Sequence, residues 1–252
     1  MSQYEMQDLG EAEYCLGMRI RRDRPKGLLM LDQTKYIEDL LMKYKMSESN
    51  PVGTPIEPNS KLKPLSKGES SPDVPYQQLI GALLYLSLST RPDIAHTVNR
   101  LSQFNTCFSL EHWNVLKRLL RYLKGTKDLC LVYGNAKQPL TGYVDADWGA
   151  CEMDRHSYTG YVFTHGGTAV SWASVKQRSV ALSSTESEYI GLTEASKEAL
   201  YLNSVLSEIF DCQNCPVLFS DNQSAKNLAI HDVYHSRTKH IDIRFHFIQY
   251  KD

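Results

Sequence analysis

The chain has 252 residues, of which 42% are hydrophobic, and this is enough to bury one large core or two smaller ones. Its 28 lysines and arginines nearly balance 29 aspartates and glutamates, so the net charge is −1. This balance excludes a uniformly basic surface for a polyanionic partner, and any nucleic-acid-binding surface must therefore be local.

The first predicted elements are a β-hairpin and a helix. Mixed apolar sequence from Ala12 to Ile20, a Pro-Lys-Gly turn and the apolar run Leu28 to Leu31 predict two paired strands. A helix is expected to begin near Gln33 and to pack on this hairpin through one apolar face. That face consists of Tyr36, Ile37, Leu40, Leu41 and Tyr44.

Residues 51–75 contain six of the ten prolines with many Ser, Lys and Glu residues, which predicts a linker or an extended strap. Helices are predicted next over Tyr76 to Leu88, from Arg91 through Leu101, and over about His112 to Leu123. The third helix has an apolar face of four leucines and an opposite basic face. The basic face consists of Lys117, Arg118, Arg121 and Lys124.

From Gly142 onward the pattern changes to strands. Residues 143–145, 158–164 and 169–173 predict three antiparallel strands, with a Gly-Gly hairpin turn before the third. A long helix is expected from Ser183 or Ser184 to Ile209, then a short, fully buried strand at 217–219, a helix through Ala229 and a last helix near 239–250. This order predicts an α+β (α/β-like) layer arrangement, with helices flanking a mixed sheet.

Three acidic residues lie where a sheet-based site would place them. Asp145 is inside the first of these strands, Glu188 is in the first turns of the long helix, and Asp221 follows the short strand. A carboxylate beside apolar sequence is costly unless it is paired, hydrogen-bonded or bound to a cation. Singly, each could be a helix cap or turn residue. Together, and without a basic neighbour, they suit a hard divalent cation such as Mg²⁺.

Two neighbouring acids complicate this assignment. Asp147 shares the strand face of Asp145, so spacing alone does not exclude it as a ligand. Glu186 lies two helical positions from Glu188, and only one of the two can face the sheet. A different type of metal site is not expected at the Cys212–Cys215 CxxC motif, because no second Cys or His pair occurs at zinc-finger spacing.

The second half contains ordered strings that resemble the RNase H of copia-type retrotransposon Pol polyproteins. They are Tyr143–Trp148, Arg155–Tyr161, Ser171–Trp172, Lys176–Gln177, Ser183–Tyr189, Asp221–Ala225 and His235–Asp242. The resemblance implies an RNase H-like fold in which Asp145, Glu188 and Asp221 are the first three metal-binding carboxylates. It favours Glu188 over Glu186, because apolar helix follows Glu188. It also implies two Mg²⁺ or Mn²⁺ ions and hydrolysis of the RNA strand of RNA–DNA hybrids.

The first half resembles the reverse transcriptase of the same polyproteins after its catalytic palm motif. Matching strings include Met6–Ala12, Thr90–Ile94 and Leu120–Thr126. The expected organisation is the end of the palm at 1–50, the proline-rich linker at 51–75, thumb and connection helices at 76–135, and RNase H at 140–252. The polymerase active-site turn would lie upstream of Met1, so polymerase activity is not expected from this chain alone.

The resemblance places a fourth acidic residue beyond Asp252, so the RNase H domain is expected to be C-terminally truncated and impaired. Asp242 is the nearest substitute, although a helix cap or a pair with Arg244 or Lys239 is favoured for it. Surface or structural roles are likewise favoured for His235 and His240 over roles in contacting substrate or releasing product.

The expected partners are an RNA–DNA hybrid or duplex and the upstream reverse transcriptase domains. A basic helix face is usually only solvated, but the resemblance favours contact of Lys117, Arg118, Arg121 and Lys124 with duplex phosphates. No run of about 18 apolar residues occurs, so no membrane contact is expected, and the resemblance implies the cytoplasm or a virus-like particle. The alternative function is a catalytically inactive remnant that binds nucleic acid.

Overall fold

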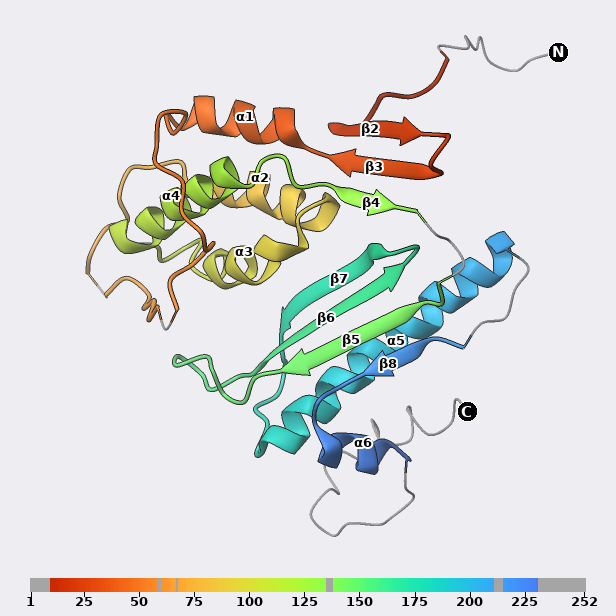
Figure 1. The fold of residues 1–252 in the computed structure, drawn as a ribbon. Helices are drawn as coiled ribbons and strands as arrows, with labels where there is room; N and C mark the ends of the chain where they lie inside the picture. The colour runs from red at the N-terminus through yellow and green to blue at the C-terminus, as the bar shows by residue number, and fades with distance from the viewer. Residues whose placement is uncertain (1–9, 59, 67, 135–137, 211–214, 231–252) are drawn as a thin grey trace, which may run out of the picture.

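A computed structural model describes residues 10–58, 60–66, 68–134, 138–210 and 215–230 of the chain (Figure 1). Six α-helices, one short 3₁₀ helix and two four-stranded sheets lie within these ranges, and one of the sheets is mixed. The predicted α+β class is confirmed at this level. The predicted helix near 239–250 lies outside the described residues, as do Cys212, His235, His240 and Asp242.

The first sheet is antiparallel and contains strands from two distant parts of the sequence. Its strands, in spatial order, are β1 (Tyr14–Cys15), β2 (Met18–Asp23), β3 (Leu28–Asp32) and β4 (Leu131–Tyr133). The predicted hairpin is the β2–β3 pair, and Gly27 has a φ of +65° in its turn, which glycine adopts without strain. β4 pairs with β3 across about a hundred residues, which local patterning did not predict.

The helices between β3 and β4 bury one apolar core. They are α1 (Thr34–Lys43), α2 (Tyr76–Ser89), the 3₁₀ helix η1 (Pro92–Ile94), α3 (Ala95–Ser102) and α4 (Leu110–Gly125). All were predicted within a few residues, because leucines and isoleucines at helical spacing form an apolar face on each. The fully buried members of this core include Leu79, Leu83, Ile94, Leu101, Leu116 and Leu120.

Outside residues 59 and 67, the segment 51–75 contains no helix or strand, yet it is attached to the helices. Leu62 is buried in the helical core, and the N–H of Leu65 donates to the carbonyl of Cys107. The segment is therefore a strap that packs on the helices and not a free linker.

The second sheet carries the predicted acidic residues. Its spatial order is β7 (Thr168–Lys176), β6 (Tyr158–His165), β5 (Thr141–Ala146) and β8 (Val217–Phe219). β6 pairs antiparallel with both β5 and β7, as predicted, and β8 is parallel to β5. The long helix α5 (Ser184–Phe210) covers one face of the sheet, and α6 (Gln223–Ile230) packs on α5 (Figure 1).

The prediction that residues 217–219 form a fully buried strand is wrong. Val217 is 45% exposed and Phe219 is 51% exposed, whereas Leu218 between them packs into the core beneath α5. β8 is the outermost strand of the described sheet, and only its α5-facing side is covered. An apolar run does not reveal whether one or both faces of its strand will be covered.

The helical core contacts the sheet face opposite α5. Ser171 faces α5, because its hydroxyl donates to Glu198, so the next residue, Trp172, points to the other side. There the Trp172 Nε1–H donates to the carbonyl of Ser87 at 2.7 Å, and α3 packs against β7. None of the described helices combines the length and apolar character needed to cross a lipid bilayer.

Candidate metal centre

Three elements bring Asp145, Glu188 and Asp221 to one edge of the second sheet. Asp145 is the penultimate residue of β5, and Asp221 follows β8 by two residues. Because β5 and β8 are parallel, their carboxyl ends lie at the same edge. α5 begins at this edge, and Glu188 is in its second turn. The local pattern of strand and helix thus places each carboxylate, and the parallel pairing brings them together.

The three carboxylates form a compact cluster. One oxygen from each of Asp145, Glu188 and Asp221 lies within 4.8 Å of the other two. Oxygens that bind one Mg²⁺ at about 2.1 Å lie at most about 4.2 Å apart, so a small closing movement would let these carboxylates share an ion. Glu188 is buried, whereas Asp145 and Asp221 are exposed to solvent. The cluster therefore has one carboxylate on its buried side and two on the side that faces solvent.

The pKa of Glu188 is shifted by its burial and by the two neighbouring carboxylates. Burial raises its pKa to about 7, and the nearby carboxylates of Asp145 and Asp221 add to this increase, while a hydrogen bond from the Ala146 backbone opposes it. Its Oε2 atom is buried and has no hydrogen-bond partner among the described residues. An unpaired buried carboxylate oxygen beside two other carboxylates fits a divalent cation, which would supply the missing partner.

Asp147 and Glu186 make hydrogen bonds elsewhere. Asp147 Oδ1 accepts from the N–H groups of Tyr158 and Ala150, at 3.1 Å and 3.3 Å, and so stabilises the turn after β5. Glu186 Oε2 accepts from the N–H of Leu182 at 2.7 Å, just before α5. The structure gives both acids a role in shaping the chain around the cluster, and neither belongs to it.

Gln177 supports the cluster, and the sequence reasoning assigned it no role. Its buried side-chain amide donates to Thr159 Oγ1 on β6 at 3.0 Å and to the carbonyl of Ser187 on α5 at 2.9 Å. Gln177 thus ties the end of β7 to the turn of α5 that presents Glu188. The Lys176–Gln177 string of the family resemblance was the available signal, but it carried no information on these contacts.

The predicted basic face on α4 is largely engaged with the strap and with the two residues just before it. Arg118 donates to Glu57 and Thr54, each at 2.9 Å, Arg121 donates to the carbonyl of Asn50 at 2.6 Å, and Lys124 donates to the carbonyl of Ser49 at 2.8 Å. Among the described residues, Lys117 alone of the four makes no hydrogen bond or ion pair. A phosphate at this face would have to compete with these internal contacts.

No protein-family model matches the chain. It is 44% identical over 253 residues to the Retrovirus-related Pol polyprotein from transposon TNT 1-94 of Nicotiana tabacum, and 41% identical over 249 residues to that from transposon RE1 of Arabidopsis thaliana. These matches cover 98% of this chain but 19% and 17% of the polyproteins, so the chain spans less than a fifth of their length.

A shorter relative is matched over most of its own length. An uncharacterized mitochondrial protein of Arabidopsis thaliana is 37% identical over 198 residues, which covers 78% of this chain and 81% of that protein. The chain is therefore homologous to a short segment of copia-type retrotransposon Pol polyproteins.

Proposed function

We propose that this chain is an RNase H-type nuclease unit that hydrolyses the RNA strand of RNA–DNA hybrids. The observation that carries the proposal is the convergence of Asp145, Glu188 and Asp221 within 4.8 Å. The relation to retrotransposon Pol polyproteins supports a nucleic-acid substrate. The proposal assigns residues 140–252 to RNase H and the preceding residues to the end of a reverse transcriptase.

The three carboxylates would hold two Mg²⁺ or Mn²⁺ ions. When bound, such ions activate a water for attack on the phosphodiester and stabilise the departing 3′ oxygen. Glu188 anchors the site from the buried side, whereas Asp145 and Asp221 face the solvent from which a substrate approaches. Because the pKa of Glu188 is about 7, its proton must leave before the carboxylate can act as a ligand, so binding of the ions releases a proton near neutral pH.

Preference for the RNA strand would depend on recognition of its 2′-hydroxyl groups, which distinguish RNA from DNA at a given position. A hybrid presents these hydroxyls on one strand only. The proposal therefore predicts cleavage of an RNA–DNA hybrid and no cleavage of a DNA duplex of the same sequence.

The test is cleavage of an end-labelled RNA–DNA hybrid by the purified chain with and without Mg²⁺. Asp145→Asn, Glu188→Gln and Asp221→Asn should each reduce the rate by more than the roughly 10–100-fold typical of residues that only support a metal ligand. Glu194→Gln is the matched control, because Glu194 is an exposed acid on α5 that lies outside the cluster. An equal loss of cleavage rate in the control variant would count against the assignment of the three carboxylates as metal ligands. Retained hybrid binding without any cleavage would replace the proposal with that of an inactive nucleic-acid-binding protein.

A further inference from the structure

A groove of about 630 Å³ leads along the sheet to the acidic cluster. One wall is formed by η1 and the beginning of α3, including His96, and the other by β6 and β7, including Trp172. Asp145 lies in the lining. Gly160, the β6 partner of Asp145, is also in the lining, and a Cβ atom there would meet no other atom within 4 Å. The sheet is therefore open beside Asp145, on the side that faces α3.

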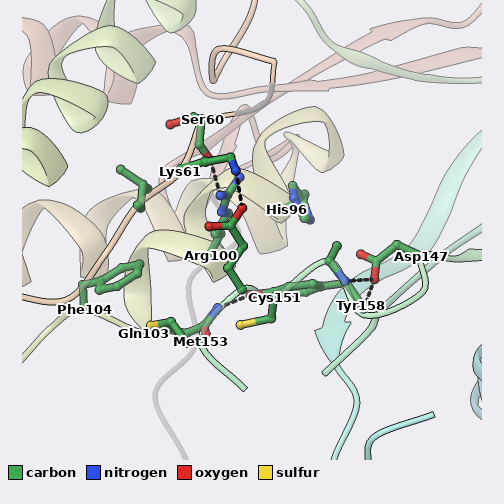
Figure 2. Close-up of a pocket in the computed structure, with 13 residues that line it drawn as sticks. Ser60, Lys61, His96, Arg100, Gln103, Phe104, Asp147, Cys151, Met153 and Tyr158 are labelled. Carbon is green, nitrogen blue, oxygen red and sulfur yellow. Dashed lines mark hydrogen bonds and ion pairs between the residues drawn. The ribbon is translucent and has the colours of Figure 1, made fainter. Parts of the chain in front are cut away.

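The groove continues into a second cavity of about 300 Å³ (Figure 2). His96, Asp147 and Tyr158 line both spaces. Figure 2 shows Arg100 from α3 and Lys61 from the strap around this second cavity. The two spaces therefore adjoin at these shared residues, and as a path of two neighbouring hollows they extend from Asp145, at the sheet edge, to basic side chains supplied by the preceding half of the chain.

Arg100 is the uncompensated cation on this path. Asp93 pairs with Arg91 at 2.7 Å, Glu152 pairs with Lys61 at 2.9 Å, and Asp147 accepts two backbone N–H groups. Arg100 donates to the carbonyl of Ser60 and has no ion pair among the described residues. A half-buried guanidinium without a carboxylate partner is suited to bind a phosphate, which it can contact with two parallel hydrogen bonds.

His96 and Trp172 add two fixed surfaces between the ends of the path. Partial desolvation lowers the pKa of His96, as does the charge of Arg100, although Asp147 has the opposite effect. The permanent positive charge at this wall is therefore that of the Arg100 guanidinium. Trp172 is half-buried, and its hydrogen bond to Ser87 holds the indole in place. An immobilised aromatic ring can stack on a base or sugar of a nucleic-acid strand.

We infer that α3 forms the second wall of the nuclease site, and that Arg100 binds a backbone phosphate of the strand whose cleavage site lies at Asp145. The inference rests on the proposed function and names a residue outside the RNase H segment as a determinant of substrate binding. The first half of the chain then contributes directly to the site and not only to the fold.

The test measures binding of a labelled RNA–DNA hybrid to the Asp145→Asn protein, which blocks cleavage, over a series of KCl concentrations. Arg100→Gln should weaken binding several-fold and reduce the slope of log K against log[salt] by about 0.7–0.9, as expected when one phosphate contact is lost. Arg100→Lys should retain most of the slope. Lys35→Gln, which removes an exposed cation on α1, is the control and should leave the salt slope of hybrid binding unchanged. Melting temperatures must show that each variant is folded, because Arg100 also holds the strap.

The outcomes separate this inference from the proposed function. If the parent chain cleaves hybrid and Arg100→Gln alters neither KM nor the salt slope, the groove inference is overturned and the nuclease proposal stands. If binding depends on Arg100 but no cleavage occurs, the nuclease proposal fails, and of the groove inference only the binding of a backbone phosphate by Arg100 stands. Inorganic phosphate serves as a competitor: if it binds at Arg100 while hybrid binding is insensitive to Arg100→Gln, the site is one for free anions and the inference is overturned.

Discussion

The side-chain amide of Gln177 lies 2.9 Å from the backbone carbonyl of Ser187, and this hydrogen bond fixes the turn of α5 that presents Glu188. The same amide bonds to Thr159 at 3.0 Å, so β6, β7 and α5 meet at one buried side chain. The position of Glu188 beside Asp145 is therefore set by a residue that would not touch a bound ion.

Gln177→Ala should weaken Mg²⁺ binding by about 10–100-fold, because it releases the turn that carries Glu188. It should also lower the free energy of unfolding by about 1–3 kcal/mol, because buried hydrogen-bonding groups on Thr159 and Ser187 lose their partner. Calorimetric Mg²⁺ titration and denaturant unfolding measure the two effects. Gln77→Ala, which removes an exposed amide bonded to Asn105, is the control. Unchanged Mg²⁺ affinity in folded Gln177→Ala protein would reduce Gln177 to a packing role.

Stability without metal should fall as pH rises from about 4.5 to about 7. Burial and the neighbouring acids raise the pKa of Glu188 from 4.5 to about 7, so over this interval the folded chain retains a proton that the unfolded chain has released. Glu188→Gln should flatten the dependence of the melting temperature on pH in this interval. Glu194→Gln, on an exposed part of α5, should not.

Mg²⁺ affinity should show the opposite trend, since the cation competes with the proton on Glu188. The apparent affinity should increase with pH and level off above about pH 7. A Mg²⁺ affinity that is constant from pH 5.5 to 7.5 would argue that Glu188 is not a ligand.

Arg91→Ala should destabilise the helical core by about 1–3 kcal/mol, because it removes the hydrogen bonds that a buried side chain makes to Asp93 and Thr126. Arg91 is 1% exposed and makes two bonds to Asp93, at 2.9 Å and 2.7 Å, and one to the carbonyl of Thr126 at 3.0 Å. Burial pushes the pKa of Asp93 upward, but hydrogen bonds and the charge of Arg91 outweigh this and hold it below its usual value.

Denaturant unfolding measures the loss, and Arg24→Ala is the matched control. Arg24 pairs with Glu11 on the surface, where such a pair contributes about 0–1 kcal/mol. Arg91→Lys should recover only part of the stability, since an ammonium group cannot reproduce the two parallel bonds to a carboxylate. Equal effects of Arg91→Ala and Arg24→Ala would contradict the assignment of Arg91 as a buried structural cation.

Replacement of Lys117, Arg118, Arg121 and Lys124 with glutamine should weaken duplex binding and reduce its salt dependence if this face contacts phosphates. The structure adds a second expectation. The fourfold variant should lose stability, because Arg118 holds the strap and two further side chains of this face hold residues 49 and 50 just before it. Lys117→Gln separates the two effects, since Lys117 has no such contact among the described residues. An unchanged salt slope in both folded variants would assign the face to solvation and strap binding.

The sequence by itself determined the order and approximate limits of the described α-helices and of most strands, but not of β1 and β4. Local spacing suffices for this, because the period of the apolar residues in α4 or the Gly-Gly turn before β7 reflects interactions within one element. It also identified Asp145, Glu188 and Asp221 as candidates, since each stands at the end of an element whose direction could be inferred.

Only the tertiary structure decided which faces are covered and which polar groups meet. The pairing of β4 with β3, the exposure of Phe219 at the sheet edge and the strap across Arg118 all depend on contacts between residues far apart in sequence. The same holds for the different surroundings of Asp145 and Asp147, since Asp145 lies in the carboxylate cluster whereas Asp147, just after β5, accepts a hydrogen bond from the N–H of Tyr158. Periodicity specifies that a face will be buried or solvated, whereas long-range packing determines what lies against it.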